Sequence, residues 1–169
     1  FYSIEADIKN GDKMKKICFF SGDITRSGGT ERVGTVIANE LHKKGQFEIS
    51  IVSLWEDKKK TFFHLEQGIK RDTLFSDHIS GKRILTYVKA VRKYVENNQI
   101  DVLVDIDGIL DLYSIPALKK NKCKLVSWEQ FNYYVNPYVN YRKLTRKMAA
   151  KKADAIVVLT DEDKHFYEK

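Results

Sequence analysis

The sequence predicts an α/β fold, a Rossmann-like doubly wound and mainly parallel sheet with helices on both faces. Short apolar runs of strand length alternate with longer segments whose apolar residues recur at helical spacing. Several of the short runs are nearly continuous in Ile, Val, Leu and Phe, as in strands that are covered on both faces. The hydrophobic fraction of 43% and the charged fraction of 31% are ordinary for one globular domain of 169 residues.

The elements follow in order along the chain. We expect strands at residues 17–21, 48–54, 101–105, 124–128 and 154–159, and a weaker one at 61–65. Val33, Ile37 and Leu41, spaced four apart, predict a helix over 30–44, and apolar spacing also favours helices over 82–97, 109–120 and 138–151. Thr160, followed by three acids, predicts one more helix N-terminus. Strands that alternate with helices in this way pair in parallel through right-handed crossovers.

Residues 1–13 read as a leader, because Met14-Lys15-Lys16-Ile17 looks like the natural start of a protein. We assign residues 14–169 to a single domain. No apolar run approaches the roughly 20 residues of a membrane-spanning helix, and the start does not resemble a signal peptide. We therefore expect a cytoplasmic protein. Cys18 and Cys123 lie in apolar runs far from the histidines, which predicts two buried thiols with neither a disulfide nor a metal site.

A doubly wound sheet binds its ligand at the C-terminal ends of two neighbouring strands whose helices leave to opposite faces. We expect the strands at 17–21 and 101–105 to be these neighbours. The loop after Ser21 and the loop around Asp107 should then meet, with Glu129 alongside.

The loop at 21–32 carries two adjacent glycines, Gly28 and Gly29, just before a helix. Without Cβ atoms the backbone there can approach a phosphate or carboxylate closely, with Thr30 beside it. The alternative is a turn that only connects two elements. The loop matches neither the Walker motif nor the Gly-x-Gly-x-x-Gly fingerprint of nicotinamide cofactors.

Four segments together resemble the N-terminal half of family 4 retaining glycosyltransferases. They are the start at 15–20, the loop Ser27-Gly28-Gly29-Thr30-Glu31-Arg32-Val33, the helix at 38–45 and the strand at 153–160. The resemblance covers about residues 14–169. It implies the GT-B architecture, in which two Rossmann-like domains face each other across a cleft, and it implies that the C-terminal donor domain is absent from this chain.

The resemblance also implies roles for particular residues. Gly28, Gly29 and Thr30 would approach the donor diphosphate, and Glu129 and Gln130 would line the reaction centre. Gln130 stands where relatives often carry a histidine, although an amide can still donate to a sugar hydroxyl. Acceptor contacts would come from Arg32, Asp107 and Asn132. The donor is then a nucleotide diphosphate sugar as co-substrate, the acceptor is a glycan or lipid-linked sugar, and no further cofactor or metal is expected.

Two acids end the strand at 101–105. Asp107 either binds an acceptor hydroxyl or caps the helix that follows, and for Asp105 the role of cap or turn residue is favoured.

Residues 142–152 hold six basic side chains and no acid. Steps of four align them along one flank of a helix. This flank is a solvated surface, a nucleic-acid contact next to several tyrosines, or a peripheral contact with the anionic inner face of a membrane through Arg142, Arg146, Lys147 and Lys151. We expect no nucleic acid partner. For the whole chain, the alternative to a transferase is a non-catalytic Rossmann-like nucleotide-binding module.

Overall fold

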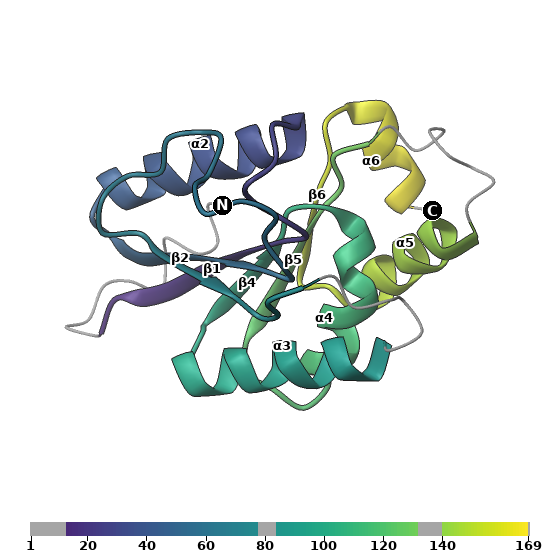
Figure 1. The fold of residues 1–169 in the computed structure, drawn as a ribbon. Coiled ribbons are helices and arrows are strands. Elements are labelled where there is room, and N and C mark those ends of the chain that lie inside the picture. Colours follow the sequence, from purple (N-terminus) through teal and green to yellow (C-terminus); the bar gives the residue numbers. More distant parts are fainter. Residues whose placement is uncertain (1–12, 78–83, 132–139, 169) are drawn as a thin grey trace.

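A computed structural model describes residues 13–77, 84–131 and 140–168 (Figure 1). Six parallel strands form one sheet in the order β3-β2-β1-β4-β5-β6. The strands are β1 (Lys15–Ser21), β2 (Phe47–Ser53), β3 (Lys70–Thr73), β4 (Val102–Asp105), β5 (Lys124–Trp128) and β6 (Ala155–Val157). The helices are α2 (Gly29–Lys43), α3 (Ile84–Asn98), α4 (Asp111–Leu118), α5 (Asn140–Lys152) and α6 (Asp161–Tyr167), with a 3₁₀ turn η2 (Gly108–Leu110) before α4. This is the predicted Rossmann-like α/β fold.

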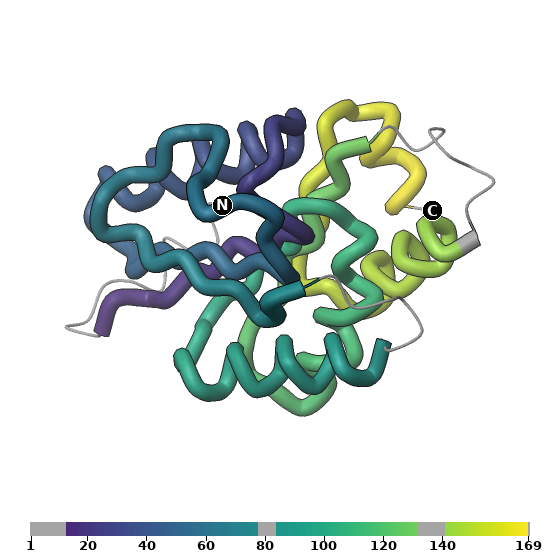
Figure 2. Tube along the Cα trace, in the orientation of Figure 1, coloured from purple at the N-terminus to yellow at the C-terminus, as the bar shows by residue number. Residues whose placement is uncertain are grey.

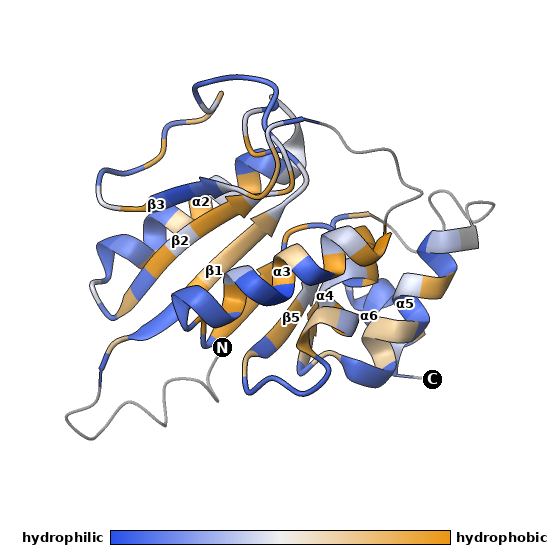
Figure 3. Ribbon diagram, turned by 60° about the horizontal axis from the view of Figure 1, so that its bottom comes forward, coloured by the Kyte–Doolittle hydropathy of each residue, from blue (hydrophilic) through white to orange (hydrophobic). Residues whose placement is uncertain are grey.

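Helices cover both faces of the sheet, as the tube in Figure 2 makes plain. Alternate residues of β1 point to opposite layers: Ile17 and Phe19 pack with α2, whereas Cys18 and Phe20 pack with α3 and α4. In Figure 3 apolar residues follow the strands between these layers, while hydrophilic residues gather on the outer sides of the helices. On the α2 side an apolar groove of about 360 Å³ lies between α2 and the strands β4, β5 and β6.

The predicted neighbours at the centre of the sheet are confirmed. β1 pairs with β4, with Ile17 opposite Val102 and Phe20 opposite Asp105. The side chain of Asp101 closes the start of this pair, because its Oδ2 accepts a hydrogen bond of 2.8 Å from the backbone N–H of Lys16.

The predicted strand at 61–65 is wrong, and the third strand is β3 instead. The sequence of β3, Lys-Arg-Asp-Thr, has no apolar residue, because an edge strand needs no covering on both sides. The segment before it is held by Asn39 of α2. The Asn39 Nδ2 donates to the carbonyl of His64 at 2.8 Å, and its Oδ1 accepts from the backbone N–H of Glu66 at 3.0 Å, so side-chain bonds replace a strand ladder.

The remaining boundaries agree closely with the predictions. Thr160 caps α6 through its Oγ1, which accepts from the backbone N–H of Asp163 at 3.1 Å. Cys18 and Cys123 are buried free thiols, and burial raises the pKa of each to about 12. The helix predicted over 109–120 starts with the 3₁₀ turn and ends at Leu118. Residues 82–83 and 138–139 of two predicted helices lie outside the described residues. Within the described ranges, none of the helices has the length and apolar content needed to span a bilayer.

Candidate functional site

A cavity of about 690 Å³ opens at the C-terminal ends of β1 and β4. The loops that follow β1, β2, β4 and β5 build it, together with Tyr113 of α4 and Leu159 after β6. It lies where α2 leaves toward one face of the sheet and α4 toward the other, which is the position at which doubly wound folds bind ligands. The volume falls in the range of small-molecule sites.

The loop after β1 is fixed from within. Asp23, which is 2% exposed, accepts hydrogen bonds from the backbone N–H and the hydroxyl of Thr25 and from the backbone N–H of Asp57. Ile24 is fully buried in the α2-side core. These contacts hold the glycine pair at the mouth of the cavity.

The two glycines have different structural demands. A Cβ atom on Gly28 would collide with Oε2 of Glu31, whereas a Cβ atom on Gly29 would meet nothing within 4 Å. A side chain on Gly28 would therefore require the carboxylate of Glu31 to move. Gly29, which lines the cavity together with Thr30, is open to whatever binds there.

Glu31 lines the cavity and was missed by sequence reasoning, which used it only as part of a motif. It is 9% exposed and sits in the first turn of α2, where the helix dipole favours an acid. No residue of the described ranges donates a hydrogen bond to its carboxylate. The sequence offered only an acid two residues after a glycine pair at a helix start, which does not reveal that the acid is buried.

Asp107 has the capping role that the sequence left open, and it also lies at the cavity. Its Oδ1 accepts from the backbone N–H of Ile109 at 3.1 Å and so caps the 3₁₀ turn, and its carboxylate also lines the cavity. Both terminal nitrogens of Arg142 in α5 donate hydrogen bonds to this carboxylate, Nη1 to Oδ1 at 3.1 Å and Nη2 to Oδ2 at 3.3 Å. This fork fixes the carboxylate in one orientation.

Glu129 and Gln130 face different surroundings. Glu129 is 3% exposed and does not line the cavity; its Oε2 accepts from Nε of Arg146 at 2.9 Å, and its Oε1 accepts from the backbone N–H of Phe131 at 3.2 Å and lies 3.6 Å from Nη1 of Arg142. Gln130 does line the cavity. Its amide nitrogen is buried and finds no hydrogen-bond partner within the described residues.

The outward orientation expected for the basic flank is wrong for two of its four residues. Arg142 and Arg146 point inward to Asp107 and Glu129, and the side chain of Arg146 is only 8% exposed. Arg142 also lies over the ring of Phe131, 4.5 Å from its centroid. Lys147 and Lys151 are exposed as expected. Spacing along a helix shows which residues share a flank. It does not show whether that flank faces solvent or faces acids of other elements, here the partly buried Asp107 and the buried Glu129.

The other predicted residues are dispersed. Arg32 is exposed and does not line the cavity, and Asn132 lies outside the described residues. Asp105 is neither a cap nor a turn residue, so that expectation is wrong. It is fully buried at the end of β4, and its Oδ1 accepts from the hydroxyl of Ser114 at 2.8 Å.

Asp105 and Asp111 form a buried carboxyl pair beneath the cavity. Asp111 accepts from the hydroxyl of Ser127 at 2.7 Å, while Oδ2 of Asp105 and Oδ1 of Asp111 are buried without a partner among the described residues. Burial, reinforced by nearby negative charge, raises the pKa of Asp105 well above its usual value and raises the pKa of Asp111 to about 7. The pair therefore keeps a proton that the unfolded chain gives up.

This pair predicts a pH dependence of stability. Because the folded carboxyl pKa values lie above the unfolded value of about 3.9, the folded state binds more protons between that pH and about pH 7. The free energy of unfolding should fall by about 1.4 kcal/mol for each pH unit in this window in which the folded state holds one extra proton. Urea unfolding at several pH values measures the slope, and Asp111→Asn should flatten it. The exposed acid Glu96, changed to Gln, is the control, and an Asp111→Asn slope equal to that of the native chain contradicts the assignment.

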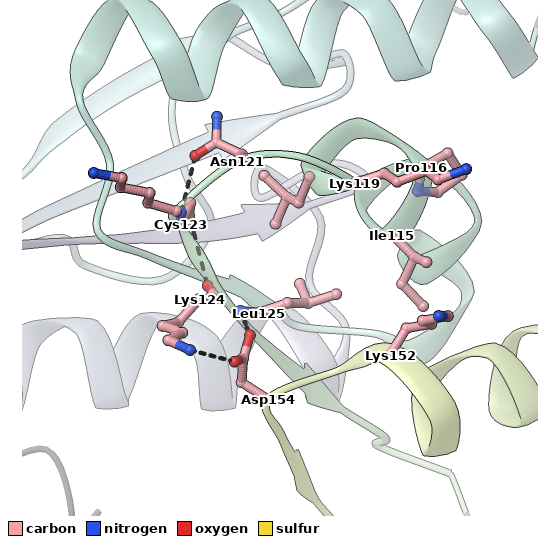
Figure 4. Close-up of a pocket in the computed structure, with 11 residues that line it drawn as sticks. Ile115, Pro116, Lys119, Asn121, Cys123, Lys124, Leu125, Lys152 and Asp154 are labelled. Carbon is pink, nitrogen blue, oxygen red and sulfur yellow. Dashed lines mark hydrogen bonds and ion pairs between the residues drawn. The ribbon is translucent and has the colours of Figure 1, made fainter.

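A second cavity, of about 780 Å³, opens beside α4 and the start of β5 (Figure 4). Its walls combine apolar side chains such as Ile115 and Leu125 with several lysines. Lys124 forms an ion pair with Asp154, Nζ to Oδ1 at 2.8 Å. None of the predicted ligand-binding residues that the structure describes lines this second cavity, so we assign the site to the first cavity.

Comparisons with known proteins agree with this fold. No family profile matches the chain. An uncharacterized glycosyltransferase of Haemophilus influenzae (strain ATCC 51907 / DSM 11121 / KW20 / Rd) is 32% identical over 156 residues, which cover 92% of this chain and 43% of that protein. The chain thus spans less than half the length of this relative.

Two solved structures share the fold at lower identity. The lipopolysaccharide outer core galactosyltransferase WaaB in its apo form is 21% identical with a TM-score of 0.64, over 91% of this chain and 43% of that one. Sucrose-phosphate synthase from Thermosynechococcus elongatus is 11% identical with a TM-score of 0.72, over 91% of this chain and 44% of that one. The chain therefore has the Rossmann-like fold found in one domain of GT-B glycosyltransferases.

Proposed function

We propose that the chain is the N-terminal, acceptor-side half of a retaining glycosyltransferase of family 4 and GT-B architecture. It would act with a second domain to move a sugar from a nucleotide diphosphate sugar to a glycan or lipid-linked acceptor. The observation that carries the proposal is the 32% identity to a protein named as a glycosyltransferase, over 92% of the chain. A cavity at the crevice where the sequence predicts the ligand supports it.

The residues of the cavity fit complementary roles in this reaction. The open backbone at Gly29 and Thr30, at the start of α2, suits close approach of the donor diphosphate. Gln130 has a free buried amide N–H that can donate to a sugar oxygen, and Asp107 is held by Arg142 with its carboxylate toward the cavity. Glu129, bound to both arginines, acts in this proposal as the group that positions its neighbour Gln130 rather than as a proton carrier.

The same proposal includes a location. We expect the protein in the cytoplasm, and a peripheral contact with an anionic membrane would now rest on the exposed lysines of α5, Lys147 and Lys151, because Arg142 and Arg146 are engaged inside. The proposal involves no metal or bound cofactor besides the sugar nucleotide.

Gly29→Val is expected to reduce sugar transfer about tenfold or more without unfolding the domain. A β-branched side chain would fill the space through which the donor diphosphate approaches, while no atom lies within 4 Å of the new Cβ. Transfer is measured with the protein expressed from its complete reading frame and a panel of nucleotide diphosphate sugars. Residues 1–169 alone should show no turnover, because donor and acceptor must be held in one cleft.

The matched control for this experiment is Ser27→Val, which places the same side chain in the same loop at an exposed residue that does not line the cavity. Binding of the nucleotide diphosphate should be retained by this control and weakened by Gly29→Val. Full transfer by the Gly29→Val protein, or turnover by residues 1–169 above a buffer blank, would refute the assignment.

A further inference from the structure

We propose that the cavity at the C-terminal ends of β1 and β4 binds an uncharged sugar ring, and that Glu31 binds the hydroxyl groups of that ring. The inference rests on the proposed function and specifies its acceptor, a neutral glycan end rather than a phosphorylated or acidic one. Three observations carry it: the aromatic walls, the unsatisfied carboxylate of Glu31, and the balance of charge.

Aromatic rings from three separate elements line the cavity. Trp55 follows β2, Tyr113 belongs to α4, and Phe131 follows β5. Two of them are fixed by neighbours: Tyr113 packs on the ring of Tyr87 with centroids 5.0 Å apart, and Phe131 lies under the guanidinium of Arg142. One face of a pyranose ring carries mainly C–H bonds, which pack favourably on aromatic surfaces, while its rim of hydroxyls needs a few placed polar groups.

Glu31 supplies a polar group of this kind. Its side chain is about nine-tenths buried and lines the cavity, yet no described residue donates a hydrogen bond to it. The carboxylate oxygens are not enclosed by protein and open to the cavity, where the hydroxyl groups of a ligand can replace water as donors. Sugar hydroxyls are donors, whereas an ionised phosphate or carboxylate group brings only acceptors and negative charge to this position.

The charges around the cavity point in the same direction. Three carboxylates line it, and the charge of Asp107 is neutralised by Arg142. Asp23 and Glu31 have no ion-pair partner among the described residues, against one lining arginine, the exposed Arg26. The guanidinium of Arg142 is already bound to Asp107 and Glu129 and does not line the cavity. A negative surface of this kind discriminates against anionic ligands. In the proposed function a second domain makes most contacts to the donor diphosphate, so the acidity of this cavity bears on the acceptor.

The test is direct binding of sugars to the 169-residue chain carrying Trp128→Phe. Trp128 lies in the apolar groove next to α2, so this change leaves Trp55 as the single tryptophan reporter. The probes are lactose, maltose and cellobiose, and the phosphorylated and acidic sugars galactose 6-phosphate, glucose 6-phosphate and glucuronic acid. At least one neutral disaccharide should change Trp55 fluorescence with millimolar affinity, and the anionic sugars should bind at least about tenfold more weakly.

Glu31→Gln should weaken binding of the neutral sugar about tenfold, since a charge-assisted hydrogen bond is lost. Glu40→Gln, an exposed acid of the same helix, is the control and should bind normally. If Glu31→Gln does not fold, Trp55→Leu, read by saturation-transfer NMR, should abolish binding instead. The inference is overturned if no neutral disaccharide binds, if the anionic sugars bind equally well, or if folded Glu31→Gln binds unchanged.

Failure of this inference and failure of the proposed function give different results. Transfer by the complete protein to an anionic acceptor would keep the transferase and overturn the neutral acceptor. Binding of neutral sugars with the predicted Glu31 dependence, but no transfer from any sugar nucleotide, would leave the site and overturn the transferase.

Discussion

Arg146→Met is expected to lower the free energy of unfolding by about 3 kcal/mol. The change removes the partner that bonds Oε2 of Glu129 at 2.9 Å, and both side chains are less than one-tenth exposed. A buried carboxylate that loses a hydrogen-bond donor is destabilised by its desolvation, whereas a carboxylate in an exposed ion pair stays hydrated. Urea unfolding at pH 7 and 25 °C measures the change.

Lys147→Met provides the control for this measurement, because Lys147 is the next residue of the same helix and is exposed. It should shift the free energy of unfolding by less than about 0.5 kcal/mol. Equal losses in the two variants would show that the Arg146 to Glu129 contact contributes nothing to stability.

Gly34→Val is expected to cost about 3 kcal/mol of stability through overpacking. A Cβ atom on Gly34 would come within 2.7 Å of Cδ1 and 3.1 Å of Cγ2 of Ile106, which is fully buried just beyond β4. The cost measures how tightly α2 lies against the sheet beside the cavity. Urea unfolding is again the measurement.

A double-mutant cycle isolates the contact between these two residues. Ile106→Val removes Cδ1, so the combined Gly34→Val and Ile106→Val protein should lose less stability than the sum of the single changes. Glu40→Val, on the exposed side of α2, controls for the β-branched residue itself. Strict additivity of the two single changes would contradict the close packing.

The sequence predicts the strands that contain an apolar run, but it does not predict β3, which has no apolar residue. Apolar runs identify β1, β2, β4 and β5, because a central parallel strand must be covered on both sides, and an apolar run also marks the edge strand β6. β3 has no apolar residue, and backbone pairing with β2 determines it, with Ser50 opposite Lys70. The local pattern of apolar and polar residues does not indicate such backbone pairing.

The position of the site could be predicted from the sequence, but the contacts among its residues could not. Strand order brings the glycine loop, Asp107 and Gln130 to one cavity, as the crossover rule predicts. The partners of Glu129 come from a helix more than a dozen residues away, and a run of basic residues gives no sign of which of them face inward. Glu31 escaped notice because only the packing around it distinguishes a buried acid from a surface acid.

The strand order also sets the sequence of folding events during synthesis. β1 and β2 can pair once residue 53 has emerged, but the central pair must wait for β4, in which Val102 meets Ile17 across 85 residues of chain. Closing so long a loop is entropically costly and slows the step that completes the sheet. Until then the edge of β1 that will pair with β4 stays open to other chains, and it carries Ile17, Cys18, Phe19 and Phe20. The nascent protein is therefore most prone to misassociation in the interval between the two pairings.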